Sequence, residues 1–211
     1  MSTVTNLRKV DVEKIQIDEG LIYLDYGEET QRKLAPTRGG GNFVATMTVH
    51  DIEFDGRNGK TAGMQTIDEQ SASLKVNTIC MSQENLALAL PGCRITSSNG
   101  TITKIKNPKC GVIPAGENDT VYAKNVTMFA KLMDGSFKKI TIFAPLHEGG
   151  LDVKAVQKAE GELGLELLAH YTTSDLNGDL YDIEEVSVDP QISESAANTN
   201  DPTANTNDPT T

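Results

Sequence analysis

The chain has 211 residues, of which 37% are hydrophobic and 5% aromatic, and it contains no tryptophan. This length suits one all-β domain with appendages. The formal net charge of −11 disfavours stable binding to nucleic acid, because a groove that grips phosphates needs clustered lysine and arginine.

The pattern of basic residues, cysteines and apolar runs argues against further classes of protein, such as disulfide scaffolds and membrane-spanning chains. The basic groups Lys104/Lys106/Lys109 and Lys138/Lys139 are diluted by neutral residues. The three cysteines show no CxxC spacing, which favours reduced thiols in a cytoplasmic chain over a disulfide scaffold. The first 14 residues are polar and predict no signal peptide, and no apolar run approaches the roughly 20 residues that span a bilayer. We expect no membrane partner.

The first predicted strands are short. Ile15 and Ile17 alternate with polar residues, and residues 21–24 form an apolar run. The next segment, about 25–41, is rich in charged residues and ends in three glycines. A connection of this length in a compact domain is usually functional or disordered, so we expect a long loop that projects from the domain.

Two longer strands change their apolar phase midway. In residues 42–54 the change falls near His50–Asp51, and in residues 121–128 it falls near Lys124–Asn125. An extra residue in a strand produces such a change, so both positions are predicted β-bulges, which bend and twist strongly curved sheets.

The remaining elements follow regular patterns. Alternating apolar and polar residues predict half-buried strands at 72–80, 140–144 and 163–171. Ser82 is a suitable cap for a helix over 83–90, which Pro91–Gly92 would end. A second short helix or turn is predicted at 151–160.

Turn residues separate these strands. Asn99–Gly100 and Asp134–Gly135 supply the positive φ angles that tight hairpins require, so both are predicted hairpin tips. About eight to ten strands and one main helix indicate a mainly β chain folded as a two-sheet β-sandwich with one flanking α-helix.

The chain divides into two parts. Residues 1–186 form the predicted β-sandwich domain. Residues 187–211 contain no lysine or arginine and end in a duplicated ANTNDPT repeat. Such a segment buries too little apolar surface to offset its chain entropy, so we expect a disordered polar tail, with a docking signal as the alternative.

Sequence motifs for chemistry are weak. Asp175–Asp179 begins like a calcium loop but lacks the later glycine and glutamate, so an acidic turn is the favoured interpretation. Arg38–Gly41 lacks the ending of a phosphate-binding loop, which favours a flexible hinge. His50, His147 and His170 lack metal-ligand spacing, and Cys80 lies on an apolar strand phase that predicts a buried thiol. We therefore expect no enzymatic activity, cofactor or metal.

Several segments together resemble one protein family. They are Leu34–Phe43, Gly63–Gly92, Lys158–Tyr171 and Leu180–Glu184. In their order along residues 10–186, they resemble the major tail proteins, or tail tube proteins, of long-tailed bacteriophages and related prophage particles.

The resemblance implies a structural virion protein that assembles in the cytoplasm of a bacterial host. Six copies would close into a ring, and the rings would stack into a tube. The lumen would hold the tape-measure protein and later conduct DNA without stable binding, while tail terminator and distal tail proteins would cap the tube ends. A long hairpin loop would contact a neighbouring subunit or ring, and its predicted residues are Glu28, Glu29, Arg32, Lys33, Arg38, Gly39, Gly40 and Gly41.

The acidic composition adds that the lumen should be net negative, so that it repels phosphate. Two alternatives stay open. One is another virion component, such as a tail terminator or decoration protein. The other is a β-sandwich binding module or hydrolase.

Overall fold

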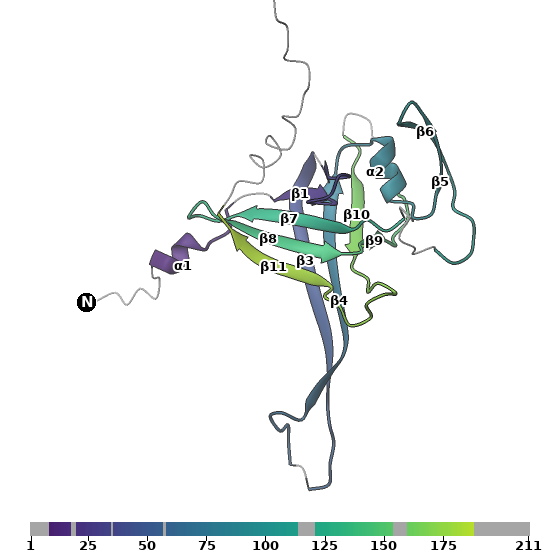
Figure 1. The fold of residues 1–211 in the computed structure, drawn as a ribbon. Helices are drawn as coiled ribbons and strands as arrows, with labels where there is room; N and C mark the ends of the chain where they lie inside the picture. The colour runs from purple at the N-terminus through teal and green to yellow at the C-terminus, as the bar shows by residue number, and fades with distance from the viewer. Residues whose placement is uncertain are drawn as a thin grey trace, which may run out of the picture.

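The computed structural model describes residues 9–17, 20–34, 36–56, 58–113, 121–153 and 160–187. Within these ranges the chain is mainly β-structure with two short helices (Figure 1). In chain order, the elements are α1 (Lys9–Glu13), β1 (Leu21–Leu24), β2 (Arg32–Lys33), β3 (Thr37–Asp51), β4 (Gln65–Thr78), α2 (Gln83–Leu88), β5 (Arg94–Ser98), β6 (Thr101–Lys106), β7 (Asn125–Lys131), β8 (Phe137–Phe143), β9 (Leu146–His147), β10 (Leu163–Leu168) and β11 (Tyr181–Val186).

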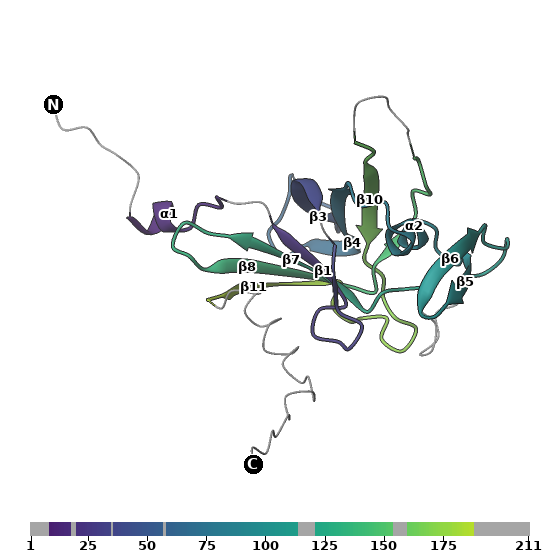
Figure 2. The same cartoon turned by 90° about the horizontal axis from the view of Figure 1, so that it is seen from above.

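The strands form two main antiparallel sheets and one separate hairpin. The first sheet has the order β11-β8-β7-β1-β2, and the second has the order β3-β4-β10-β9. Among the strands that the structure describes, β5 and β6 pair only with each other. Seen from above, this hairpin lies beside α2 at one end of the molecule (Figure 2).

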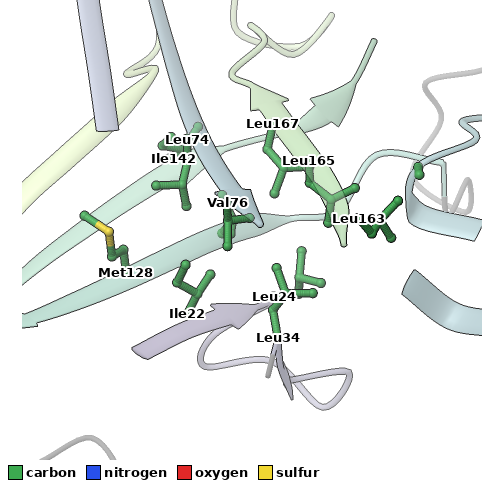
Figure 3. Packing of buried hydrophobic residues seen from close by; sticks show 12 residues of the cluster. Ile22, Leu24, Leu34, Leu74, Val76, Met128, Ile142, Leu163, Leu165 and Leu167 are labelled. Atoms are coloured by element: carbon green, nitrogen blue, oxygen red, sulfur yellow. The ribbon is translucent and has the colours of Figure 1, made fainter. Parts of the chain in front are cut away.

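The two main sheets share one hydrophobic core (Figure 3). On β10, Leu163, Leu165 and Leu167 are buried while the residues between them are more exposed, as the predicted alternation requires. They pack in a cluster with side chains of β1, β4, β7 and β8, including Ile22, Leu74, Val76, Val126 and Ile142. The prediction of a mainly β chain with two packed sheets is therefore confirmed.

Several local predictions are also confirmed. Ser82 caps α2 by accepting a hydrogen bond from the backbone amide of Asn85 at 3.2 Å. Asn99 and Gly100 join β5 to β6 with φ angles of 51° and 77°, the positive values that a two-residue hairpin turn needs. Asp134–Gly135 lies in the turn between β7 and β8.

Both predicted bulges need correction. The register of β3 against β4 shifts between Thr48 and Val49, and the extra residue is Asp68 on β4, not a residue of β3. Residues 121–124 form no strand, and β7 begins at Asn125, so the phase change there marks the start of a strand. Ile15 and Ile17 flank an isolated bridge between Gln16 and Leu132, which is shorter than a strand.

Other predictions fall partly outside the described residues. Of the segment 151–160, residues 151–153 are not helical and residues 154–159 lie outside the described ranges. Residues 188–211 of the predicted tail lie outside them as well. No helix in the described ranges is long and apolar enough to cross a bilayer.

We predict that Leu165→Ala lowers the free energy of unfolding by about 2–5 kcal/mol, because it leaves a cavity between the two sheets. Urea unfolding followed by circular dichroism would measure this loss. Leu176→Ala is the matched control, since that leucine is 70% exposed, and its effect should stay within about 0.5 kcal/mol. Equal effects of the two substitutions would contradict the described core.

Candidate assembly surfaces

The segment 25–41 is not one projecting loop. Residues 25–31 form a turn between β1 and β2, and residues 37–41 belong to β3. The turn is held against the domain, because the amide of Asp25 donates to the carbonyl of Asn125 at 2.8 Å. The Glu28 carboxylate pairs with Lys124 at 2.6 Å. The turn at residues 25–31 is therefore bonded to the start of β7 and the residue before it.

Arg32 serves the packing of α2. Its guanidinium donates to the side-chain oxygen of Asn85 at 2.8 Å, and Asn85 is itself buried. The Asn85 amide nitrogen donates in turn to the carbonyl of Cys80 at 3.0 Å. Burial lowers the pKa of Arg32. This partly buried contact anchors α2 to the edge strand β2, whose other residue, Lys33, pairs with Tyr23 of β1.

The glycines at the start of β3 shape the strand. Gly39 and Gly40 have positive φ angles of 77° and 69°, and the register against β4 shifts between Arg38 and Gly41. A side chain at Gly41 would meet the Met128 sulfur at 2.6 Å and Ile22 at 3.1 Å. These residues therefore bend β3 and let it approach the core closely, which corrects the predicted hinge at the base of a loop.

Arg38 and Glu29 complete the set of predicted loop residues. Arg38 bonds Glu162 at 2.6 Å and Glu160 at 3.0 Å, and all three side chains are largely exposed. These hydrogen bonds and charges raise the pKa of Arg38. Glu29 is exposed in the turn before β2. A contact of these residues with another subunit stays a prediction.

The element that does project is the far end of the β3–β4 hairpin. We name residues 45–56 and 58–71 the distal ribbon. In Figure 1, β3 and β4 run past the two sheets and extend well below them. β10 pairs with β4 along residues 73–78, so among the described strands those of the distal ribbon pair only with each other.

One face of the distal ribbon is apolar. Phe43 and Ala45 of β3 lie opposite Leu74 and Ala72 of β4, which face the core. Because alternate residues of a strand share a face, Met47 and Val49 continue this inner face beyond the core. They are 62% and 48% exposed, and Ile67, opposite Val49, is 53% exposed. The inner face of the β3-β4-β10-β9 sheet thus extends beyond the opposing sheet that covers it.

The cover ends at β11, the edge strand of the opposing sheet. Tyr181 of β11 meets Phe43 edge to face, with ring centroids 5.3 Å apart. Met47, Val49 and Ile67 lie beyond this contact on the distal ribbon. We name these three side chains the apolar stripe.

The other face of the distal ribbon is polar. Thr46 lies 2.6 Å from Ser71 through their hydroxyl oxygens. Farther along, Asp68 bonds His50 and accepts from Thr66 at 2.7 Å. The Thr66 and His50 hydrogen bonds lower the pKa of Asp68. These bonds hold the bulged end of the ribbon in one register.

The other candidate residues have structural partners. His147 is buried, accepting from the Glu166 amide at 3.0 Å and donating to the Gly150 carbonyl at 2.8 Å. Cys80 follows β4 and is only half-buried, which corrects the predicted core thiol. Asp175 accepts from the amide of Asn177 in a turn. In the described ranges, no group of three or more His, Cys, Asp or Glu side chains is placed to hold a metal ion.

No protein-family model matches the chain, and no curated protein matches it.

The sequence did not predict that the apolar stripe is exposed. Its alternating signal is present in residues 42–54, but the same signal describes a strand that is covered. Only the length of the opposing sheet decides which of these side chains are exposed, and that length depends on pairings between segments far apart in the chain.

We predict that Gly41→Val lowers the free energy of unfolding by about 1–3 kcal/mol, because its side chain would overpack against Met128 and Ile22. Chemical unfolding monitored by circular dichroism would measure it. Gly59→Val is the control, since a Cβ there meets nothing within 4 Å. If Gly41→Val left the free energy of unfolding unchanged, β3 would lie farther from the core than described.

Proposed function

We propose that this chain is a structural subunit of a phage tail tube. Copies would form rings that stack around a channel, which holds the tape-measure protein and conducts DNA. The ordered resemblance of four segments to tail tube proteins supports the family. The apolar stripe on the projecting distal ribbon is the observation that carries the proposal, because it calls for a partner surface.

The energetic reason is the isolation of the distal ribbon. A two-stranded hairpin by itself is marginally stable in water, and more strands or a packed face are needed for stability. Fully burying one large aliphatic side chain contributes about 1.5–3 kcal/mol. The three side chains of the apolar stripe are about half exposed or more, so a second copy that covered them would supply much of that stabilisation.

The unpaired edge of the ribbon also favours contact with another copy. β3 is an edge strand along its whole length, and an unpaired edge is a template for further strand pairing. When different surfaces of identical subunits meet, the contacts propagate until they close into a ring or extend as a filament. A ribbon that reaches from one copy to another surface of the next copy produces such a heterologous contact.

We accordingly assign the contact with a neighbouring subunit or ring to the distal ribbon, in place of the segment 25–41. The turn at residues 25–31 contacts its own domain, whereas the distal ribbon extends away from it. The net charge of −11 supports the rest of the proposal, since an acidic channel wall would let DNA pass without holding its phosphates.

The test is to shorten the ribbon without disturbing the domain. Residues 49–68 are replaced by Asn-Gly, which joins Thr48 to its cross-strand partner Glu69 through a two-residue turn. We expect negative-stain electron microscopy to show rings or tubes for the full chain, and light scattering to show a monomer for the shortened chain. The two should have similar circular dichroism spectra after allowance for the lost strand residues.

Two outcomes would contradict the proposal in different ways. A full chain that stays monomeric at high concentration would overturn the tube function. If the shortened chain assembles as well as the full chain, the tube function stands, but the distal ribbon has no part in assembly.

A finer variant tests the apolar stripe alone. Met47→Thr, Val49→Thr and Ile67→Thr together keep residues that favour strands but remove apolar surface. We expect the concentration at which half the chain assembles to rise by about tenfold or more, measured by light scattering, because each buried methylene contributes about 0.8 kcal/mol. Thr48→Val, on the polar face, is the control and should not raise this concentration.

A further inference from the structure

One part of this acidic chain carries a net positive charge because it contains no acidic residue. Residues 85–116 contain four basic residues and no aspartate or glutamate, although the whole chain has 30 acidic and 19 basic residues. The four are Arg94, Lys104, Lys106 and Lys109, and the first three lie on the β5–β6 hairpin. In sequence they looked diluted, because neutral residues separate them.

The hairpin gathers its three basic residues on one face. Arg94 lies opposite Lys106, and Thr96 lies opposite Lys104. Positions two apart on one strand and opposite partners on the other share a face, so Arg94, Lys104 and Lys106 form one basic face. Ile95 pairs with Ile105 on the other face, and Ile95 lines a groove together with residues of α2. The apolar face is thus turned toward the domain.

The basic face lacks an anionic partner in the described part of its own chain. Among the described residues, no salt bridge involves Lys104 or Lys106, and both are exposed. Like charges directly opposite each other on neighbouring strands are destabilising, and Arg94 and Lys106 are such a pair. An acidic surface placed over this face would convert the repulsion into attraction.

The distal ribbon has the complementary composition. Residues 45–71 contain five acidic and two basic residues, and Glu53 and Glu69 are both exposed. Figure 1 places the β5–β6 hairpin beyond α2, well away from the end of the distal ribbon. The two elements of one copy are therefore separated, and they would meet only between copies.

We propose that the basic face of the β5–β6 hairpin in one copy docks on the acidic distal ribbon of another copy. The inference rests on the proposed self-assembly and specifies which surfaces meet. Two different surfaces take part, so the contact is heterologous and suits rings or stacked rings. Complementary charge would also fix which part of the hairpin meets the ribbon, because a shifted arrangement would place like charges together.

The experiment exchanges charges between the two surfaces. The first variant carries Lys104→Glu and Lys106→Glu, and the second carries Glu53→Lys and Glu69→Lys. Each variant alone presents two surfaces of the same sign, so we expect the concentration needed for half assembly to rise by about tenfold or more. Mixed in equal amounts, the two variants restore both attractive contacts, so assembly should return as an alternating structure.

Controls separate this contact from net charge and from folding. Lys9→Glu with Lys131→Glu changes the net charge equally at exposed positions outside the two surfaces and should assemble normally. Circular dichroism of every variant reports folding. Light scattering between 50 and 500 mM sodium chloride should show weaker assembly of the full chain at high salt, since exposed charges are screened.

The outcomes distinguish this inference from the tube function itself. If the full chain assembles and the Lys104→Glu/Lys106→Glu variant assembles equally well, the docking contact is wrong and the tube subunit stands. If the full chain does not assemble, both fail. If the full chain binds a 30-base-pair DNA duplex by fluorescence anisotropy and only this binding is lost in the first variant, the basic face is a nucleic-acid surface and the proposal is overturned.

Discussion

The structure depends on one inequality: the β3–β4 hairpin is longer than the sheet that covers it. Inside the domain, alternate residues of β4 and β10 pack against β1, β7 and β8 and form the shared core. The same apolar alternation continues along β3 and β4 after β11, the last strand of the opposing sheet, has ended. The hydrophobic effect that joins the two sheets therefore leaves Met47, Val49 and Ile67 without a cover within the described chain.

Local backbone features make this long hairpin possible. Gly41 lets β3 pass close to Met128, where any side chain would collide. At the other end, the extra residue Asp68 breaks the register, and its bonds to His50 and Thr66 secure the polar face. A bulge increases the twist of a strand pair, which also makes an exposed edge a poorer template for random pairing.

Charge adds specificity to the apolar surface. Burial of the apolar stripe would supply affinity without direction, because the hydrophobic effect is not directional. The basic face of β5–β6 and the acidic distal ribbon differ in sign and lie on different parts of the subunit. Electrostatic complementarity between surfaces mainly selects partners and orientation. In a chain of net charge −11, a 32-residue stretch with four basic residues and no acidic residue is consistent with such a role.

The sequence by itself determined the local elements, because their signals are local. Alternation in 163–171 predicted the burial of Leu163, Leu165 and Leu167, although β10 ends at Leu168 and Tyr171 is exposed. Ser82 predicted the start of α2, and Asn99–Gly100 predicted the turn of a hairpin. It did not determine which connection projects. A charged segment with three glycines looked like a free loop at 25–41, whereas buried Asn85 and core-facing Gly41 hold that segment to the domain. Strand pairing, sheet length and the gathering of Arg94, Lys104 and Lys106 on one face arise from contacts between distant residues, so only the tertiary structure decided them.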